Sequence, residues 1–213
     1  MIYILDDYES ITDEVLERMM GLLPPKRREK AEKFRYRNGK LTCAVAYLLF
    51  LYGYRREFGG RDIPDFALDE NEKPFLPDRP GVHFNLSHCN RATVCMLGHA
   101  PVGIDIQELR PVKEEFSARI CSERELERIA ASPNPQREFT RIWTEKEAIS
   151  KYTGEGIFRD VRCVSADAAP DQSMVATTQP LPDVFVTACA RIEDADFTFC
   201  HVTAEDLLKL SGQ

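Results

Sequence analysis

The chain has 213 residues, of which 43% are hydrophobic and 30% are charged, a composition typical of a soluble globular protein with one large domain or two small ones. The formal net charge of −7 argues against a general nucleic-acid binder, which would carry a dominant basic surface. The longest apolar stretch, residues 41–54, is shorter than the roughly 20 residues needed to span a bilayer, so we expect no membrane partner.

Helices are predicted for the first part of the chain. Ser10 followed by Asp13 is typical of a helix start, and apolar residues then recur at helical spacing. The proline pair at 24 and 25 ends this helix and opens a second, basic helix. A third helix, over about residues 40–56, is apolar on most of its faces and should be buried.

Strands and further helices are predicted for the rest of the chain. Three runs rich in β-forming residues cover residues 82–86, 92–97 and 102–106. An amphipathic helix is expected over residues 112–131, and another over residues 137–152, closed by Gly154. The tail should hold two or three strands, around residues 183–192 and 197–202, and a last short helix near residue 207. Helices followed by strands in each half suit a two-lobed α+β protein.

The cysteines indicate a reducing compartment. Their number is odd and their spacing is scattered, without any Cys-x-x-Cys pair: Cys43, Cys89, Cys95, Cys121, Cys163, Cys189 and Cys200. A disulfide framework or a zinc site would need tighter clustering, so buried free thiols are the better interpretation. The first ten residues also carry no basic leader, and we therefore expect a cytoplasmic protein.

Seven basic residues gather in a short segment that follows the proline pair. They are Lys26, Arg27, Arg28, Lys30, Lys33, Arg35 and Arg37. A dense basic segment in an acidic protein indicates a local anion site. A solvated helix face is the alternative, and composition alone favours it.

A polar pair lies on the strand predicted at residues 102–106 and just beyond it. Alternate side chains of a strand share a face, so Ile104 and Ile106 should be buried on one side while Asp105 and Gln107 project together from the other. Two oxygen-bearing side chains at this spacing can hold a hard cation such as Mg²⁺. A half-exposed strand with a polar face is the alternative, which this segment alone favours.

The helix predicted at residues 137–152 carries a carboxylate between lysines. Trp143, Glu147 and Lys151 are four residues apart and therefore line one helix face, and Lys146 adds a second cation beside Glu147. Such a carboxylate can serve a metal while the lysines meet phosphate oxygens. The alternative is a Glu–Lys pair on a solvated helix beside a core tryptophan.

The third chemical segment is Asn-Leu-Ser-His at residues 85–88, at the end of a predicted strand. The hydroxyl of Ser87 and the imidazole of His88 can both donate a hydrogen bond to a phosphate. An isolated histidine is more often structural, and this segment by itself leaves both interpretations open.

In this order, the three segments resemble the 4′-phosphopantetheinyl transferase family of the monomeric, surfactin-synthetase-activating (Sfp) type. The ordered set spans residues 85–156, where Gly154 and Gly156 match a Lys-x-x-Gly-x-Gly turn, and weaker similarity extends upstream through Lys73 and the basic segment. The resemblance implies two pseudo-equivalent α+β lobes, residues 1–101 and 102–213, with coenzyme A in the cleft between them. It also implies an Mg²⁺-dependent monomer that transfers phosphopantetheine to a serine of an apo acyl- or peptidyl-carrier protein and releases 3′,5′-ADP.

The resemblance further implies roles for individual residues. Asp105, Gln107 and Glu147 would hold Mg²⁺, although many family members have glutamate in place of Gln107. Glu147 would also accept the proton of the carrier serine, and Lys151 and His88 would act at the transferring phosphate. The residues expected to contact the coenzyme are Arg27, Lys30, Lys73, Ser87, His88, Lys146 and Lys151.

Two other functions compete with transfer. Gln107 favours a non-catalytic protein that binds coenzyme A or a carrier, whereas the carboxylates and lysines argue against it. A nucleic-acid-binding role is disfavoured because the basic segment lacks interleaved stacking aromatics. The carrier is expected at the segment after Gln107, where Phe116 and Ile120 lie among basic residues. The alternative is that Phe116 and Ile120 belong to the core.

Overall fold

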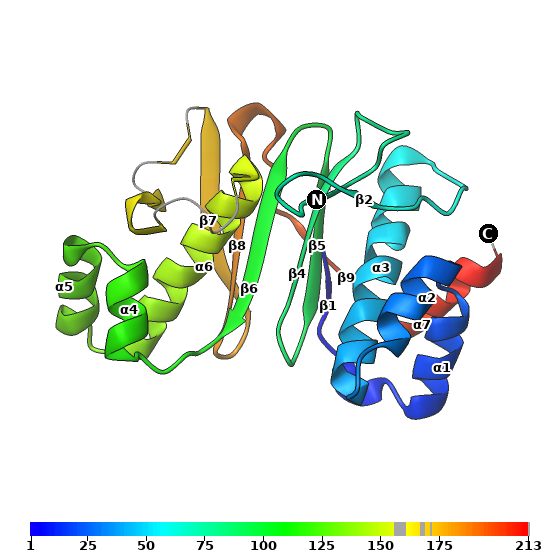
Figure 1. The fold of residues 1–213 in the computed structure, drawn as a ribbon, viewed down its shortest axis with the longest axis horizontal. Helices are drawn as coiled ribbons and strands as arrows, with labels where there is room; N and C mark the ends of the chain where they lie inside the picture. The colour runs from blue at the N-terminus through cyan, green and yellow to red at the C-terminus, as the bar shows by residue number, and fades with distance from the viewer. Residues whose placement is uncertain (156–160, 167–168, 171, 213) are drawn as a thin grey trace.

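Two β-sheets pack face to face at the centre of the protein, and helices cover the outer face of each sheet (Figure 1). This computed structural model describes residues 1–155, 161–166, 169–170 and 172–212. The predicted α+β class is confirmed. Gly156, part of the expected glycine turn, lies outside the described residues. No helix of the described ranges is long and apolar enough to cross a membrane.

The first sheet has four strands in the order β4-β5-β1-β9. Their bounds are β1 Ile2–Leu5, β4 His83–His88, β5 Thr93–Gly98 and β9 Phe199–His201. β1 lies antiparallel to β5 and parallel to β9. The C-terminal segment therefore returns to the first sheet, and the lobe boundary expected at residues 101 and 102 stays a prediction. β1, a central strand, was not predicted from the sequence.

Four helices and a hairpin accompany the first sheet. Their bounds are α1 Asp13–Gly21, α2 Pro25–Glu32, α3 Arg37–Phe58, α7 Ala204–Leu208, β2 Ala67–Leu68 and β3 Pro74–Phe75. The buried third helix is confirmed as α3, whose apolar side chains share one core with the outer face of the sheet. The predicted helix start at Ser10 is wrong: Ser10 ends a 3-10 helix, and Thr12 caps α1 by accepting a hydrogen bond from the N–H of Val15 (3.3 Å).

The second sheet has three antiparallel strands in the order β6-β8-β7. Their bounds are β6 Val102–Glu108, β7 Ser173–Leu181 and β8 Val184–Arg191. Ile104 and Ile106 of β6 are buried, as predicted, and pack against Ile2 and Ile4 of the first sheet. These apolar faces form a core between the two sheets, which holds the two halves of the chain together.

Three helices belong to the second sheet, with the bounds α4 Glu114–Ile120, α5 Glu123–Ala131 and α6 Pro135–Thr153. The single helix predicted over residues 112–131 is wrong, because Ser122 caps a new helix there in a reciprocal pair of hydrogen bonds with Glu125. The helix predicted over residues 137–152 is confirmed as α6, which ends at Gly154 with φ of 75°. Further 3-10 helices cover Val161–Cys163, Ile192–Asp194 and Lys209–Gly212.

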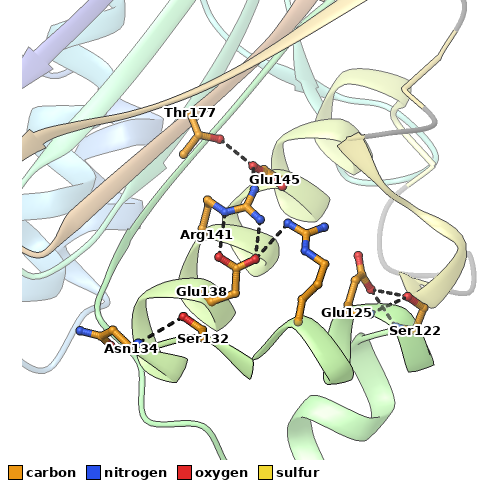
Figure 2. A network of polar contacts seen from close by, with 9 residues as sticks. Ser122, Glu125, Ser132, Asn134, Glu138, Arg141, Glu145 and Thr177 are labelled. Carbon is orange, nitrogen blue, oxygen red and sulfur yellow. Dashed lines mark hydrogen bonds and ion pairs between the residues drawn. The ribbon is translucent and has the colours of Figure 1, made fainter. Parts of the chain in front are cut away.

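A chain of ion pairs fixes α6 to its neighbours (Figure 2). The guanidinium of Arg141 pairs with Glu138 (2.7 Å) and also with Glu145, both on α6. Glu145 accepts a hydrogen bond from Thr177 of β7 (3.1 Å), and Glu138 pairs with Arg128 of α5 (2.9 Å). The helix is therefore anchored by charged groups on the side that faces α5 and β7.

Glycine at position 103 lets α6 approach β6 closely. A Cβ atom at this position would lie 2.1 Å from the carbonyl oxygen of Ala148 and 2.4 Å from the amide nitrogen of Tyr152. Both atoms belong to the backbone of α6, which cannot yield as a flexible side chain would. The absence of a side chain at position 103 thus sets the distance between strand and helix.

We expect Gly103→Ala to lower the free energy of unfolding by about 3 kcal/mol, because overpacking against backbone costs this much. Urea denaturation measures the change. Gly21→Ala is the matched control, since a Cβ there meets nothing within 4 Å, and it should leave stability unchanged or slightly raised. Equal stability of Gly103→Ala and the wild type would contradict the close approach.

Candidate functional site

Side chains of β4 satisfy the free edge of β6. The Oδ1 atom of Asn85 accepts a hydrogen bond from the N–H of Ile104 (3.0 Å), and the Oγ atom of Ser87 accepts one from the N–H of Ile106 (3.3 Å). β6 pairs with β8 along its other edge, so these amides would otherwise be buried without acceptors. These two hydrogen bonds, the seam between the sheets, fix the position of β6 relative to β4, and thereby the position of Asp105.

Asp105 is the centre of a buried polar cluster. Its Oδ1 atom accepts hydrogen bonds from the hydroxyl of Ser87 (2.7 Å) and the ammonium of Lys151 (2.6 Å), and its Oδ2 atom accepts one from the amide of Gln107 (3.0 Å). The common face predicted for Asp105 and Gln107 is therefore confirmed. The alternative of a half-exposed polar face does not hold for Asp105, which is only 2% exposed.

Glu147 brings a second carboxylate to the cluster. Burial raises the pKa of Glu147, and the negative charge of Asp105 raises this pKa further, whereas the charges of Lys151 and Arg110 act in the opposite direction. Two carboxylates in such surroundings repel each other, and a bound cation would relieve the repulsion.

The donor set fits Mg²⁺ as a partial site. Carboxylate oxygens are the ligands that this ion prefers, and it commonly binds one or two carboxylates while phosphates and water complete its coordination. The described ranges contain no group of three or more His, Cys, Asp and Glu side chains that could hold a metal. Asp105 and Glu147 could therefore hold Mg²⁺ only together with a phosphate ligand or water.

Both ends of the Gln107 amide are hydrogen-bonded. Its nitrogen donates to Asp105, and its oxygen accepts a hydrogen bond from the Nε atom of Arg110 (2.8 Å). The oxygen that was expected to reach a metal is thus directed toward Arg110.

Two adjoining pockets contain most of the predicted coenzyme contacts. One, of about 440 Å³, is lined by Arg27, Lys30 and His88, together with residues of α3 and of the hairpin. The other, of about 420 Å³, is lined by Lys73, Glu147 and Lys151 and lies against α6. The pockets share the lining residues Glu72, Pro74 and Leu86. They are large enough, and polar at the right places, for a small-molecule ligand.

The basic segment divides into two groups. The guanidinium of Arg27 lies 3.9 Å from the ring centre of Phe66, and burial lowers the pKa of Arg27. Lys30 is exposed beside it in the same pocket. Neighbouring basic residues pair with surface carboxylates instead, as Lys26 does with Asp65 (2.6 Å). A solvated helix face therefore describes only part of the segment.

Lys73 joins the hairpin to the end of α6. Its ammonium donates to the carbonyl oxygens of Lys151 (2.6 Å) and Tyr152 (3.2 Å), and burial lowers the pKa of Lys73. Asn71 adds a hydrogen bond from its amide to the carbonyl oxygen of Gly154 (2.8 Å). Lys73 lines the pocket, but its charge is directed to the carboxyl end of the helix, where a cation is stabilising.

Ser87 and His88 point in different directions. Ser87 faces Asp105, whereas His88 lines the pocket of Arg27 and Lys30. Partial burial lowers the pKa of His88, and the charge of Lys151 adds to this effect. The neutral imidazole is consequently favoured near pH 7.

Lys146 is not brought to the pockets. It is 1% exposed, pairs with Glu125 of α5 (3.0 Å) and donates to the carbonyl oxygens of Val161 (2.9 Å) and Val164. The structure thus gives no support to the predicted contact of Lys146 with the coenzyme, and shows this lysine joining α6, α5 and the segment that follows α6.

Sequence reasoning missed the roles of three residues of the site. Asn85 was part of a motif without a role of its own, Asn71 was not considered, and Arg110 was expected only among the basic residues of the carrier segment. Only Arg110 had a local signal, because a cation three residues after Gln107 can fold back onto it at the end of a strand. The contacts of Asn71 and Asn85 join segments far apart in the chain.

Comparisons with known proteins identify the family of the chain. The family model of the 4′-phosphopantetheinyl transferase superfamily matches residues 101–200. The chain is 30% identical over 151 residues to the 4′-phosphopantetheinyl transferase Sfp of Bacillus subtilis (strain 168), covering 69% of this chain and 67% of that one. It is 28% identical over 183 residues to another 4′-phosphopantetheinyl transferase of Bacillus subtilis, covering 84% and 80%. The AcpT transferase of Escherichia coli (strain K12) is 32% identical over 137 residues, covering 60% and 66%.

The matched residues include both carboxylates of the buried cluster, Asp105 and Glu147, and the lysine between the pockets and the cluster, Lys151. Similarity over two thirds of a relative's length also extends well beyond these short motifs. The chain belongs to the 4′-phosphopantetheinyl transferase superfamily.

Proposed function

We propose that this protein transfers the 4′-phosphopantetheine group of coenzyme A to a serine of an apo acyl- or peptidyl-carrier protein and releases 3′,5′-ADP. Membership of the superfamily identifies the chain as a 4′-phosphopantetheinyl transferase. The observation that carries the proposal is the buried cluster of Asp105, Glu147 and Lys151 next to a pocket that holds Arg27 and Lys30.

Coenzyme A would lie along the two adjoining pockets. Arg27 and Lys30 would bind the 3′-phosphate of the ribose, because a guanidinium and an ammonium are suitable partners for phosphate oxygens. Lys151 and His88 would meet the pyrophosphate, and Lys73 would hold the wall of the pocket at the end of α6. For this, Lys151 must exchange part of its contact with Asp105 for a phosphate oxygen.

Asp105 and Glu147 would hold Mg²⁺. Gln107, the third ligand that the resemblance implies, has its amide oxygen engaged by Arg110 and would reach the ion only if this hydrogen bond broke. When bound, the ion would neutralise charge on the pyrophosphate as the transfer proceeds. Ser87 would orient Asp105 through its hydroxyl. The ion would give the two carboxylates the positive counter-charge that Lys151 supplies when no ion is bound.

Glu147 would serve as the proton acceptor. Burial raises the pKa of Glu147 in the metal-free protein, whereas a bound cation would lower it, so the proposed role as base rests on the place of Glu147 in the family motif. Glu147 would take the proton from the carrier serine as the serine oxygen bonds to the β-phosphorus. The bond from this phosphorus to the bridging oxygen then breaks, and its electron pair leaves with 3′,5′-ADP. Lys151 and His88 would stabilise the charge that develops on the phosphate oxygens.

The carrier would dock on the face of α4. Phe116 is 36% exposed and rests edge-on against Trp143, with ring centres 5.5 Å apart, whereas Ile120 is buried in the core below it. Of the two expected docking residues, only Phe116 is thus available to a partner. Basic residues around it would offset the repulsion between an acidic carrier and this acidic protein.

A monomeric state, a cytoplasmic location and two lobes of residues 1–101 and 102–213 are further parts of this proposal. They are expectations from the sequence, and each has a direct measurement: sedimentation equilibrium, fractionation of cells, and limited proteolysis.

Mass spectrometry of the carrier tests the function. The protein is incubated with Mg²⁺, coenzyme A and a panel of apo acyl- and peptidyl-carrier proteins, and each carrier is then weighed. We expect at least one carrier to gain the mass of one phosphopantetheine group, and its serine-to-alanine variant to gain nothing. Tight coenzyme A binding without any gain in mass across the panel would instead favour a non-catalytic binding protein.

Asp105→Asn tests the metal site. Loss of one carboxylate should lower turnover by about a hundredfold or more, since Lewis-acid assistance contributes several kcal/mol. The sequence alone indicates that Asp105→Ala would leave the fold intact, but burial with three partners makes asparagine the better choice. Asp78→Asn, at an exposed position, is the control and should keep normal turnover. Near-normal turnover of Asp105→Asn at ordinary Mg²⁺ concentration would exclude this residue as a metal ligand.

Lys30→Glu combined with Arg27→Gln tests the phosphate pocket. The pair should raise the KM for coenzyme A by about tenfold or more, because charged hydrogen bonds of roughly 1.5–3 kcal/mol are lost. The KM for dephospho-coenzyme A, which lacks the 3′-phosphate, should change little. Lys33→Glu is the control, since Lys33 is exposed and does not line the pocket. Equal effects on both coenzymes would mean that these residues do not recognise the 3′-phosphate.

A further inference from the structure

The amide of Gln107 bridges a buried carboxylate and an exposed guanidinium. Its nitrogen is 3.0 Å from the Oδ2 atom of Asp105, and its oxygen is 2.8 Å from the Nε atom of Arg110. A carboxylate can only accept and a guanidinium can only donate, so the two neighbours determine which end of the amide faces which partner. Rotating the amide by a half turn would break both hydrogen bonds.

Arg110 is itself fixed to α6. Its backbone N–H donates to the Oγ1 atom of Thr140 (2.9 Å), and this hydroxyl donates to the carbonyl oxygen of Gln136 (2.8 Å). Thr140 is fully buried. The start of the Arg110 side chain is therefore held in place, although the side chain itself is exposed and folds back toward β6.

The charge of Arg110 is felt within the cluster. Besides its contact with Gln107, it lies close enough to Glu147 to lower the pKa of that carboxyl against the effect of burial. Glu147 thus has two cations nearby, Lys151 and Arg110, and Lys151 is also paired with Asp105. Lys151 would turn to phosphate in the proposed complex, whereas Arg110 is tied to the protein.

We propose that Arg110 is a positioning residue of the metal site that acts through Gln107. By engaging the amide oxygen, it directs the amide nitrogen onto Asp105 and keeps position 107 out of the coordination shell of the ion. The inference rests on the proposed function, because it concerns the Mg²⁺ of the transfer site. Its consequence is specific: a carboxylate introduced at position 107 would pair with Arg110 rather than with the metal.

Mg²⁺ binding to four proteins tests this inference. They are the wild type, Gln107→Glu, Arg110→Met and the double variant, each saturated with coenzyme A and titrated with Mg²⁺ in a calorimeter. With Arg110 present, Gln107→Glu should change the Kd for Mg²⁺ less than about twofold, because the new carboxylate would pair with the guanidinium of Arg110. With Arg110→Met, the same change should tighten Mg²⁺ binding by about tenfold, since the new carboxylate is then free to ligate.

Arg119→Met is the matched control, because Arg119 is an exposed arginine of α4 that does not contact Gln107. It removes the same charge, and Gln107→Glu should behave in this background as it does in the wild type. Equal tightening of Mg²⁺ binding by Gln107→Glu in all three backgrounds would overturn the inference while leaving the proposed function intact. A wild type that binds neither coenzyme A nor Mg²⁺ would overturn the proposed function, and the inference with it.

Discussion

The unpaired edge of β6 is the constraint on which the rest of the structure depends. A buried strand at the edge of a sheet cannot leave its amides without acceptors, and here two side chains of β4 supply them, Asn85 and Ser87. Because alternate residues of β4 face opposite ways, Leu86 and His88 are left to line the pockets. One short motif therefore joins the sheets through Asn85 and Ser87 and also contributes Asn85, Leu86 and His88 to the walls of the two pockets.

The same seam explains how a charged cluster can be buried. Asp105 has every oxygen engaged by Ser87, Gln107 and Lys151, so its charge is paired and hydrogen-bonded rather than isolated. The missing side chain at Gly103 brings α6 near enough for Lys151 to reach it. Asp105 is thus held in place without any ligand, and in the proposed complex Lys151 would change partner, from Asp105 to a phosphate oxygen.

Periodicity and spacing predicted much of this arrangement, and contacts between distant segments account for what they missed. The two-residue repeat placed Asp105 and Gln107 on one face of β6, and the 3.6-residue repeat predicted α6. β1 was missed because four residues give too short a pattern, and α4 was merged with α5 because the apolar spacing continues across the cap. Lys146 belongs to the same motif as Glu147 and directly precedes it. Adjacent residues of a helix point in different directions, and only the fold shows that Lys146 is the one that enters the core. The hydrogen bond from Arg110 to Gln107 could not be predicted without knowing the course of the chain at the end of β6.

A crystal structure of the protein with coenzyme A and Mg²⁺ tests the central claim most directly, namely that the two adjoining pockets hold the coenzyme with its pyrophosphate at the buried carboxylates. We predict the 3′-phosphate within hydrogen-bond distance of Arg27 and Lys30, and the ammonium of Lys151 moved from Asp105 toward a pyrophosphate oxygen. A coenzyme bound elsewhere, with Lys151 still paired to Asp105 and the pockets empty, would contradict the account.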